Sequence, residues 1–368
     1  MVMTDNQQTG AEQQLVARVE AARAAGTPLL IQGGATKAFY GNPVPAGTVL
    51  DCSVHRGVLA YEPTELAVTA RAGTPLGELE GLLAEHGQEL PFEPPHFGAR
   101  ATLGGMVAAG LSGPRRPYAA SVRDAVLGAR ILTGSGEVMS FGGRVMKNVA
   151  GYDLSRLMAG SLGVLGVLLE VSLKVMPTPP GRITLAQEQD QASALTLMQR
   201  WARQALPITA TAWIDGRLYV RAAGSGEALA QTRKVLGGEL LEAADAFWTE
   251  VREQRLEGFQ GDMPLWRLSV RPATAAAALP DCFLLEWGGA LRWLRSAQPA
   301  DSVRAAAKAA GGHATLFRLG AAQCPADGVF APLDPVGMRL HRRLQQAFDP
   351  AGILNPGRLY PALSAAHR

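Results

Sequence analysis

The stretch "IQGGATKAFYG", residues 31–41, decides how the rest of this sequence is interpreted. Paired glycines directly after an apolar, strand-like run are typical of backbone that folds closely around a ligand. A Walker loop places a glycine immediately before its lysine, which Lys37 lacks, and the adjacent Gly33 and Gly34 do not fit a Rossmann fingerprint. The stretch therefore has the chemistry of an anion-binding loop without a familiar nucleotide-binding pattern.

The composition describes a globular protein with room for two domains. The chain has 368 residues, of which 47% are hydrophobic and 18% charged, so it can bury a sizeable core and is not a disordered type. Its 42 glycines predict many tight turns and close approaches of backbone to a ligand. The net charge of +3 is small for this length, and no cluster of basic residues interleaved with aromatics indicates a nucleic-acid surface.

The three cysteines, Cys52, Cys282 and Cys324, lie far apart in the sequence, and none belongs to a C-x-x-C pair. Iron–sulfur clusters and structural zinc sites usually need four ligands in paired spacing, so we expect no metal in this chain. Three such cysteines form no disulfide framework, which fits a reducing compartment. The N-terminus has no signal-peptide pattern, and no stretch reaches the roughly twenty apolar residues of a membrane span. We expect a cytoplasmic chain, peripheral to the inner membrane at most through a complex.

Hydrophobic periodicity predicts that the first half mixes helices and strands. Helical spacing extends over residues 8–25 and ends at Gly26. Strands are predicted within 27–34 and 65–73, followed by a helix that has Thr74 as its N-cap and ends at Gly87. Residues 124–143 predict a hairpin that turns at 133–136. In 167–175 the alternate apolar residues are expected to share one strand face.

The stretch "PTPPG", residues 177–181, is the clearest boundary, because its prolines continue neither a helix nor a strand ladder. Beyond it, Asp215 and Gly216 predict the turn of a hairpin, and further strands are predicted in 264–272, 282–289 and 313–319. With alanine-rich helices between the strands, we expect an antiparallel sheet with helices on one face. In 264–272 the polar residues alternate with apolar ones, so a polar face would overlook a ligand or a partner.

Two more glycine-rich stretches, residues 98–117 and 147–166, follow the first. Three such stretches, each beside a predicted strand or helix start, suit a long ligand with a diphosphate, because bare backbone N–H groups must approach the phosphates closely. The alternative is that all three are ordinary surface turns.

Five segments together resemble a known family. They are "QGGATKAFYG" (32–41), the run 62–95, "ATLGGMVAAG" (101–110), "KNVAGYDLSRLMAGSLGVLG" (147–166) and "FDPAGILNPGR" (348–358). They are similar to the FAD-binding domain of the vanillyl-alcohol oxidase, or p-cresol methylhydroxylase, superfamily. Within it they most resemble the FAD-binding E subunits of bacterial glycolate oxidases.

The resemblance implies an α+β chain with a two-part FAD-binding domain of the p-cresol methylhydroxylase type. A smaller cap domain of antiparallel sheet and helices would face the substrate or a partner. On this division, residues 1–178 form the FAD-binding domain, 179–345 the cap, and 346–368 a C-terminal segment that returns to the FAD domain.

The resemblance also assigns cofactor contacts. In the family the first loop wraps the pyrophosphate, the second contacts the diphosphate and ribityl chain, and the third lines the adenosine. The implied FAD contacts are Gln32, Gly33, Gly34, Ala35, Thr36, Lys37, Thr102, Leu103, Gly104, Gly105, Met106, Gly163, Val164, Gly166, Val167, Asn355 and Arg358. Glycine would remove Cβ atoms that hold the phosphates away. The first loop contains no histidine, so the FAD is expected to be non-covalent.

A flavin that oxidises a 2-hydroxy acid needs a base near the substrate hydroxyl and a cation for the carboxylate. The sequence leaves the catalytic residues unknown, and the candidates are His96, His313 and Arg358. Arg358 and Lys147 could lie near the flavin ring, where a cation favours the reduced, anionic form. The alternative for each is a plain loop or surface role.

The remaining histidines give no constellation. Related catalytic subunits carry a metal-binding stretch near the position of His313, but this chain lacks its acidic residue and second histidine, so no metal site is expected there. His55, His86, His341 and His367 are predicted to be surface residues.

Several functions fit these observations. The first is an FAD subunit that supports oxidation of glycolate to glyoxylate and passes electrons to a second FAD subunit and an iron–sulfur subunit. The second is a catalytically silent FAD-binding scaffold. A stand-alone flavin-dependent 2-hydroxy-acid dehydrogenase and an NADPH-dependent reductase are further alternatives.

Overall fold

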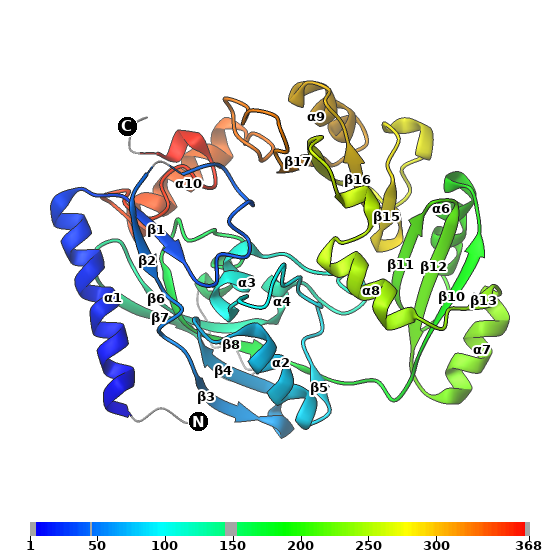
Figure 1. Cartoon of the computed structure of the whole chain (residues 1–368), viewed down its shortest axis with the longest axis horizontal. Helices are drawn as coiled ribbons and strands as arrows, with labels where there is room; N and C mark the ends of the chain where they lie inside the picture. Colours follow the sequence, from blue (N-terminus) through cyan, green and yellow to red (C-terminus); the bar gives the residue numbers. More distant parts are fainter. Residues whose placement is uncertain (1–4, 45, 144–152, 365–368) are drawn as a thin grey trace.

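The computed structural model describes residues 5–44, 46–143 and 153–364, arranged as two sheet-containing parts. Figure 1 shows the first half of the chain on the left and the cap on the right, with the C-terminal segment back beside β1. The elements of the first half are α1 (Asp5–Ala25), β1 (Leu29–Gln32), β2 (Thr48–Asp51), β3 (Val58–Glu62), β4 (Ala67–Arg71), α2 (Leu76–Glu85), β5 (Gln88–Glu89), α3 (Leu103–Ala109), α4 (Val122–Ala125), β6 (Val126–Leu132), β7 (Val138–Gly142), α5 (Leu154–Leu157), β8 (Val167–Lys174) and β9 (Met176–Pro177).

Local sequence signals account for most of these boundaries. Gly26 adopts a φ of 62° where α1 ends, a conformation that glycine reaches without a Cβ penalty. Asp153 caps α5, since its side chain accepts a hydrogen bond from the Arg156 N–H. The prediction for Thr74 was wrong: α2 has no side-chain cap, and the Thr74 hydroxyl accepts the N–H of Gly57 instead.

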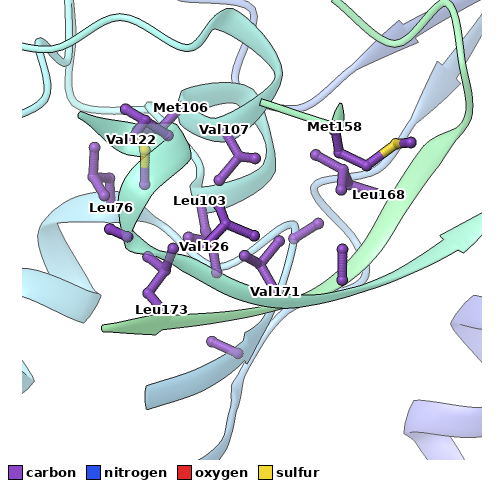
Figure 2. Close-up of a cluster of buried hydrophobic side chains, with 14 of the residues drawn as sticks. Leu76, Leu103, Met106, Val107, Val122, Val126, Met158, Leu168, Val171 and Leu173 are labelled. Atoms are coloured by element: carbon purple, nitrogen blue, oxygen red, sulfur yellow. The ribbon is translucent and has the colours of Figure 1, made fainter. Parts of the chain in front are cut away.

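The first half is organised around β8. Its sheet has the strand order β3-β4-β8-β6-β7, while β1 and β2 form a separate parallel pair. Apolar residues of α2, α3 and β8 form one buried cluster (Figure 2), which holds Leu76, Leu103, Met106, Val107, Val122, Val126, Met158, Leu168, Val171 and Leu173 among others. This packing fixes α3, and with it the loop before α3, against the sheet.

The single-face prediction for 167–175 was wrong. Val167 and Leu169 pack with α1 and β1, whereas Val171, Leu173 and Val175 pack with α2 and α3. The pairing of β8 with β6 shifts register between Arg130 and Ile131, and a bulge of this kind moves side chains to the other face.

The cap contains one eight-stranded sheet with the order β13-β10-β12-β11-β15-β16-β14-β17, and every pairing in it is antiparallel. The predicted hairpin turns at Asp215 and Gly216, whose φ values are 51° and 75°. The cap elements are β10 (Arg182–Glu188), α6 (Gln191–Trp201), β11 (Ile208–Ile214), β12 (Arg217–Ala223), α7 (Gly226–Leu236), β13 (Glu239–Leu240), α8 (Ala244–Glu253), β14 (Leu265–Ser269), β15 (Leu284–Glu286), β16 (Leu291–Arg295), α9 (Ala300–Ala309) and β17 (His313–Arg318).

The expectation that helices cover only one face of this sheet was wrong. Helices α6, α7 and α9 cover one face, but α8 lies on the other face, between the sheet and the first half (Figure 1). Trp248 and Val251 of α8 share a buried cluster with Tyr40, Leu111 and cap residues. The cap therefore packs onto the first half through a continuous apolar interface.

The chain returns to the first half through α10 (Pro335–Phe348). Phe348 joins the cluster of α2 and α3, and the Asn42 side chain accepts the N–H of Val329 at 2.7 Å. Because α10 already packs on the first half, we propose that the returning segment begins near residue 330, earlier than the boundary at 346 expected from the sequence.

Candidate functional site

A cavity of about 220 Å³ lies where β1 ends, between the first glycine loop, α3 and the C-terminal segment. Of the predicted cofactor contacts, its wall includes Gln32, Gly33, Gly34, Ala35, Thr36, Lys37, Thr102, Gly105, Asn355 and Arg358. Sequence reasoning missed other wall residues, namely Leu30, Ile31, Ala38, Val44, Ala108, Ala109 and Leu162. The adjacent small residues at the end of α3 were the one signal that could have indicated Ala108 and Ala109.

The first loop presents a row of free backbone donors to this cavity. For the five consecutive N–H groups of residues 33–37, no acceptor exists within the described part of the chain. Ala35 has a φ of 57°, which is unusual for a residue with a side chain, and such a kink turns successive N–H groups toward a common point. Consecutive backbone donors without protein acceptors, in a partly buried loop, have the chemistry of an anion-binding concavity.

The glycines of the first loop also allow close packing within the protein. A Cβ atom on Gly33 would lie 2.3 Å from the Thr102 hydroxyl oxygen, and one on Gly34 would lie 1.5 Å from the Arg100 carbonyl oxygen. These glycines therefore let the first and second loops pack directly against each other. That they also clear space for phosphates stays a prediction.

The second loop has no comparable donors. The N–H groups of Leu103 and Gly104 donate to the carbonyls of Thr74 and Ala72, and the N–H of Met106 donates within α3. The side chains of Leu103 and Met106 are buried in the core and do not line the cavity. Thr102 caps α3 by accepting the Gly105 N–H at 3.2 Å. Only Thr102 and Gly105 of this predicted set reach the cavity wall.

No residue of the third predicted set lies in the cavity wall. Val164 and Val167 are buried, and Gly163 lies against Asn355, where an added Cβ would come within 2.8 Å of the amide nitrogen. The neighbouring Leu162 lines the cavity instead. None of Gly163, Val164, Gly166 and Val167 lines this cavity, and Gly163 lies directly against Asn355 of its wall.

The C-terminal segment holds the first loop in place. Asn355 accepts the N–H of Ile31 at 2.8 Å through Oδ1 and donates to the carbonyl of Leu162 at 2.7 Å through Nδ2. The Nη2 group of Arg358 donates to the carbonyls of Ala38 and Tyr40 at 2.7 and 2.6 Å. The protein thereby holds both ends of the loop, at Ile31 and at Ala38 and Tyr40, while residues 33–37 between them line the cavity.

Lys37 connects this loop to the cap. Its Nζ donates to the carbonyl of His96 at 3.2 Å, and the Glu253 carboxylate of α8 accepts the N–H groups of His96 and Phe97 at 3.2 and 2.7 Å. Burial lowers the pKa of Lys37 to about 8, and the negative charge of Glu253 opposes that shift. The lysine is therefore a cation near neutral pH that loses its charge more readily than an exposed lysine.

Comparison with known proteins agrees with this geometry. The family model described as FAD binding domain matches residues 8–142, and the one described as FAD linked oxidases, C-terminal domain, matches 330–359. The glycolate oxidase subunit GlcE of Escherichia coli is 49% identical over 351 residues, which are 95% of this chain and 98% of that protein. The chain belongs to the GlcE family of FAD-binding proteins.

More distant relatives share parts of the chain or its fold. The glycolate oxidase subunit GlcD of Bacillus subtilis is 29% identical over 185 residues, which cover 50% of this chain and 39% of that protein. The solved structure of p-cresol methylhydroxylase with substrate bound has a TM-score of 0.71 at 15% identity and covers 95% of this chain and 87% of that one. The fold is therefore of the p-cresol methylhydroxylase type, in a chain that binds FAD.

The predicted catalytic candidates of this GlcE-family chain lie apart. His96 is not part of the cavity wall, and its Nε2 lies 3.0 Å from a carboxylate oxygen of Glu80. His313 is an exposed residue at the start of β17. Arg358 alone reaches the cavity, where it holds the loop. Lys147 and His367 lie outside the described residues.

His55 was predicted to be a surface residue, but its side chain is buried, with 2% exposed, beneath α1. Its imidazole lies with the carboxylates of Glu12 and Glu170 in a group whose ligand atoms are within 4.8 Å of one another. Arg130 already donates to both carboxylates, at 2.7 Å to Glu12 and 3.1 Å to Glu170. The guanidinium thus occupies both carboxylates and offsets part of the charge that would attract a metal ion, and we assign no metal to this group.

No helix of the described residues has the length and apolar character needed to span a membrane.

Proposed function

We propose that this chain is the FAD-holding subunit of an enzyme that oxidises glycolate to glyoxylate. The observation that carries the proposal is the row of five free N–H groups at the cavity, in a chain that is 49% identical to the E. coli glycolate oxidase subunit GlcE along almost its whole length.

The residues present fit a dinucleotide. The N–H groups of residues 33–37 would hold the diphosphate, because consecutive backbone donors form an anion-binding concavity. The Lys37 ammonium would add a positive charge at the same wall, while Ala108 and Ala109 leave room for an extended ligand. FAD supplies the hydride-accepting chemistry when it is bound.

The remaining residues of the site position this loop. Asn355 accepts the Ile31 N–H just before the loop, and Arg358 donates to the carbonyls of Ala38 and Tyr40 at its end, so both ends of the loop are fixed before a ligand binds. Glu253 and the 96–97 turn hold Lys37 from the cap side. Preorganisation of this kind lowers the entropic cost of binding.

We further propose that electrons leave through partner subunits, a second FAD subunit and an iron–sulfur subunit. The relatives GlcE and GlcD are both named as glycolate oxidase subunits, which supports the first partner. Burial raises the pKa of Cys52 to about 12 and of Cys282 to about 11, so both remain protonated thiols and are poor metal ligands at neutral pH. Peripheral attachment to the inner membrane through that complex belongs to the same proposal.

The test combines spectra with assembly. The purified chain should show a flavin absorption spectrum with added FAD, and co-expression with a GlcD-type and an iron–sulfur partner should give glycolate-dependent reduction of a quinone analogue. Robust glycolate turnover by the chain alone would defeat the subunit assignment, and failure to bind FAD would defeat the proposal as a whole.

A catalytically silent scaffold is the second candidate, favoured by the placement of His96 and His313 outside the cavity wall. It predicts that glycolate leaves the flavin of this chain oxidised even within the assembled complex. Bleaching of that flavin by glycolate would exclude it.

A further inference from the structure

Arg267 of β14 is a cation at the interface between the cap and the first half that lacks a hydrogen-bond acceptor. Its guanidinium lies 5.1 Å from the centre of the Trp287 ring, and no described residue forms a hydrogen bond or ion pair with it. Elsewhere in the cap, Arg292 donates to the carbonyls of Gly289, Ala275 and Thr274. An enclosed charge is normally compensated in this way, so Arg267 is positioned to bind an anion.

A second cation reaches the same ring from the first half. Arg116, an exposed residue in the segment after α3, lies 4.7 Å from the centre of the Trp287 ring. Burial lowers the pKa of Arg267 and the positive charge of Arg116 lowers it further, so the two cations repel each other, and an anion near both would relieve that repulsion. Trp287 is itself held in place, with a φ of 56° and its Nε1 donating to the Gly113 carbonyl at 3.0 Å. Backbone strain of this kind is characteristic of binding sites.

A carboxyl group and a hydroxyl group complete the cluster. Glu286 is buried and accepts the Nε1 of Trp293 at 2.7 Å, but no ion pair joins it to Arg267. Glu286 and Arg267 both line a small cavity of about 20 Å³. Ser112 and other residues of the interface complete its wall. Tyr40, which ends the first glycine loop, packs in the same interface, and no described residue forms a hydrogen bond with its hydroxyl group.

We propose that Arg267 and Arg116 bind the carboxylate of a small 2-hydroxy acid and that Glu286 accepts the hydrogen bond of its hydroxyl group. This inference rests on the proposed function, because it places the acid beside the loop that would hold the cofactor. The cavity now has room for roughly one water molecule, so side chains around it must move to admit the acid. Its size favours a two-carbon acid over longer ones.

Binding of oxalate, a two-carbon acid, to the FAD-loaded full-length chain tests the site. Calorimetry gives the dissociation constant without any turnover. We expect Arg267→Met to weaken oxalate binding at least about tenfold, Arg267→Lys to restore part of it, and Arg116→Gln to weaken it severalfold. Arg255→Met is the matched control, because Arg255 is an exposed cap arginine paired with Glu250, and it should leave binding unchanged.

The pH dependence of oxalate binding tests the charge of Glu286 separately from the two arginines. Burial raises the pKa of Glu286 to about 7, while the Trp293 hydrogen bond and Arg267 lower it and Glu93 raises it. As the pH rises through this range Glu286 gains negative charge, so oxalate binding to the wild type should weaken severalfold between pH 6 and 8. Glu286→Gln should remove this pH dependence.

Failure of this inference can be distinguished from failure of the proposed function. If Arg267→Met and Arg116→Gln bind oxalate as tightly as the wild type while the assembled enzyme oxidises glycolate, the inference is overturned and the proposed function stands. If the complex does not oxidise glycolate but oxalate binding still depends on Arg267, the anion site stands without the function. Malonate binding as tight as oxalate would overturn the size preference.

Discussion

The first and second glycine loops lie against each other at one cavity but use their backbones differently. Residues 33–37 keep five N–H groups free of acceptors within the described structure, whereas Leu103, Gly104 and Met106 donate theirs to protein carbonyls. Both loops are rich in glycine, so glycine content does not distinguish a ligand cradle from a packing contact. The two loops differ in whether their N–H groups find acceptors within the protein. For Leu103 and Gly104 those acceptors are carbonyl groups from residues distant in sequence.

The largest expected effect comes from Gly34→Ala. The new Cβ would meet the Arg100 carbonyl oxygen at 1.5 Å, which is backbone and cannot move aside, so the two loops would separate. We expect the FAD dissociation constant to rise about a hundredfold, or ~2.7 kcal/mol, as measured by flavin fluorescence.

Two matched substitutions sharpen this result. A Cβ on Gly105, in the second loop, would meet only the Thr102 side chain at 3.1 Å, and one on Gly77 of α2 would meet nothing within 4 Å. Gly105→Ala should therefore weaken FAD less than Gly34→Ala, and Gly77→Ala should be neutral. Equal losses from the substitutions in the two loops would contradict the difference described here. Circular dichroism checks that each variant is folded.

Next in size is Glu253→Gln. The carboxylate of Glu253 accepts hydrogen bonds from the turn at residues 96–97, and the carbonyl of His96 in that turn accepts from Lys37. Hydrogen bonds to a charged acceptor contribute about 1.5–3 kcal/mol. The neutral amide should raise the FAD dissociation constant about tenfold. Glu250→Gln, on the same helix but paired at the surface with Arg255, is the control and should change little. An unchanged affinity in Glu253→Gln would show that the cap does not support the first loop.

A smaller effect is expected from pH. The pKa of Lys37 is lowered to about 8 by burial, so above that value the free protein loses the positive charge that would attract a diphosphate. A bound anion raises that pKa, so FAD affinity should fall as the pH rises from about 8 until the bound-state pKa is passed. Titrations between pH 6.5 and 9.5 measure this, and Lys37→Gln should flatten the profile. A profile that keeps its slope in Lys37→Gln would assign the titration to another group.

The smallest effect is expected from Thr102→Ala. Its hydroxyl caps α3, and loss of an N-cap costs about 1 kcal/mol of unfolding free energy. We expect this change in denaturant unfolding, with FAD affinity altered less than about threefold. Thr102→Ser keeps the cap and is the control. A loss of FAD affinity larger than that of Gly34→Ala would reverse the roles assigned to the two loops.

Much of the fold could be predicted from local pattern. Helix α1, the turn at Asp215 and the alternation along β14 each depend on neighbours within a few residues, as do the cap of α5 and most boundaries. The errors share a cause. Helix α8 packs on the sheet face that was expected to be uncovered, His55 is buried under α1, and the side chains of β8 change face at a bulge. Each of these features depends on a partner distant in sequence.

From the sequence alone, the pattern predicted a glycine-rich first half and a boundary at the prolines, and the resemblance of five segments implied the p-cresol methylhydroxylase-type fold, because these are local properties of the chain. Only the tertiary structure decided which loop keeps its donors free, that Glu253 supports Lys37 from the cap, and that Arg267 has no acceptor among the described residues. A hydrogen bond is settled by whichever group arrives within about 3 Å, and here those groups come from positions up to hundreds of residues away.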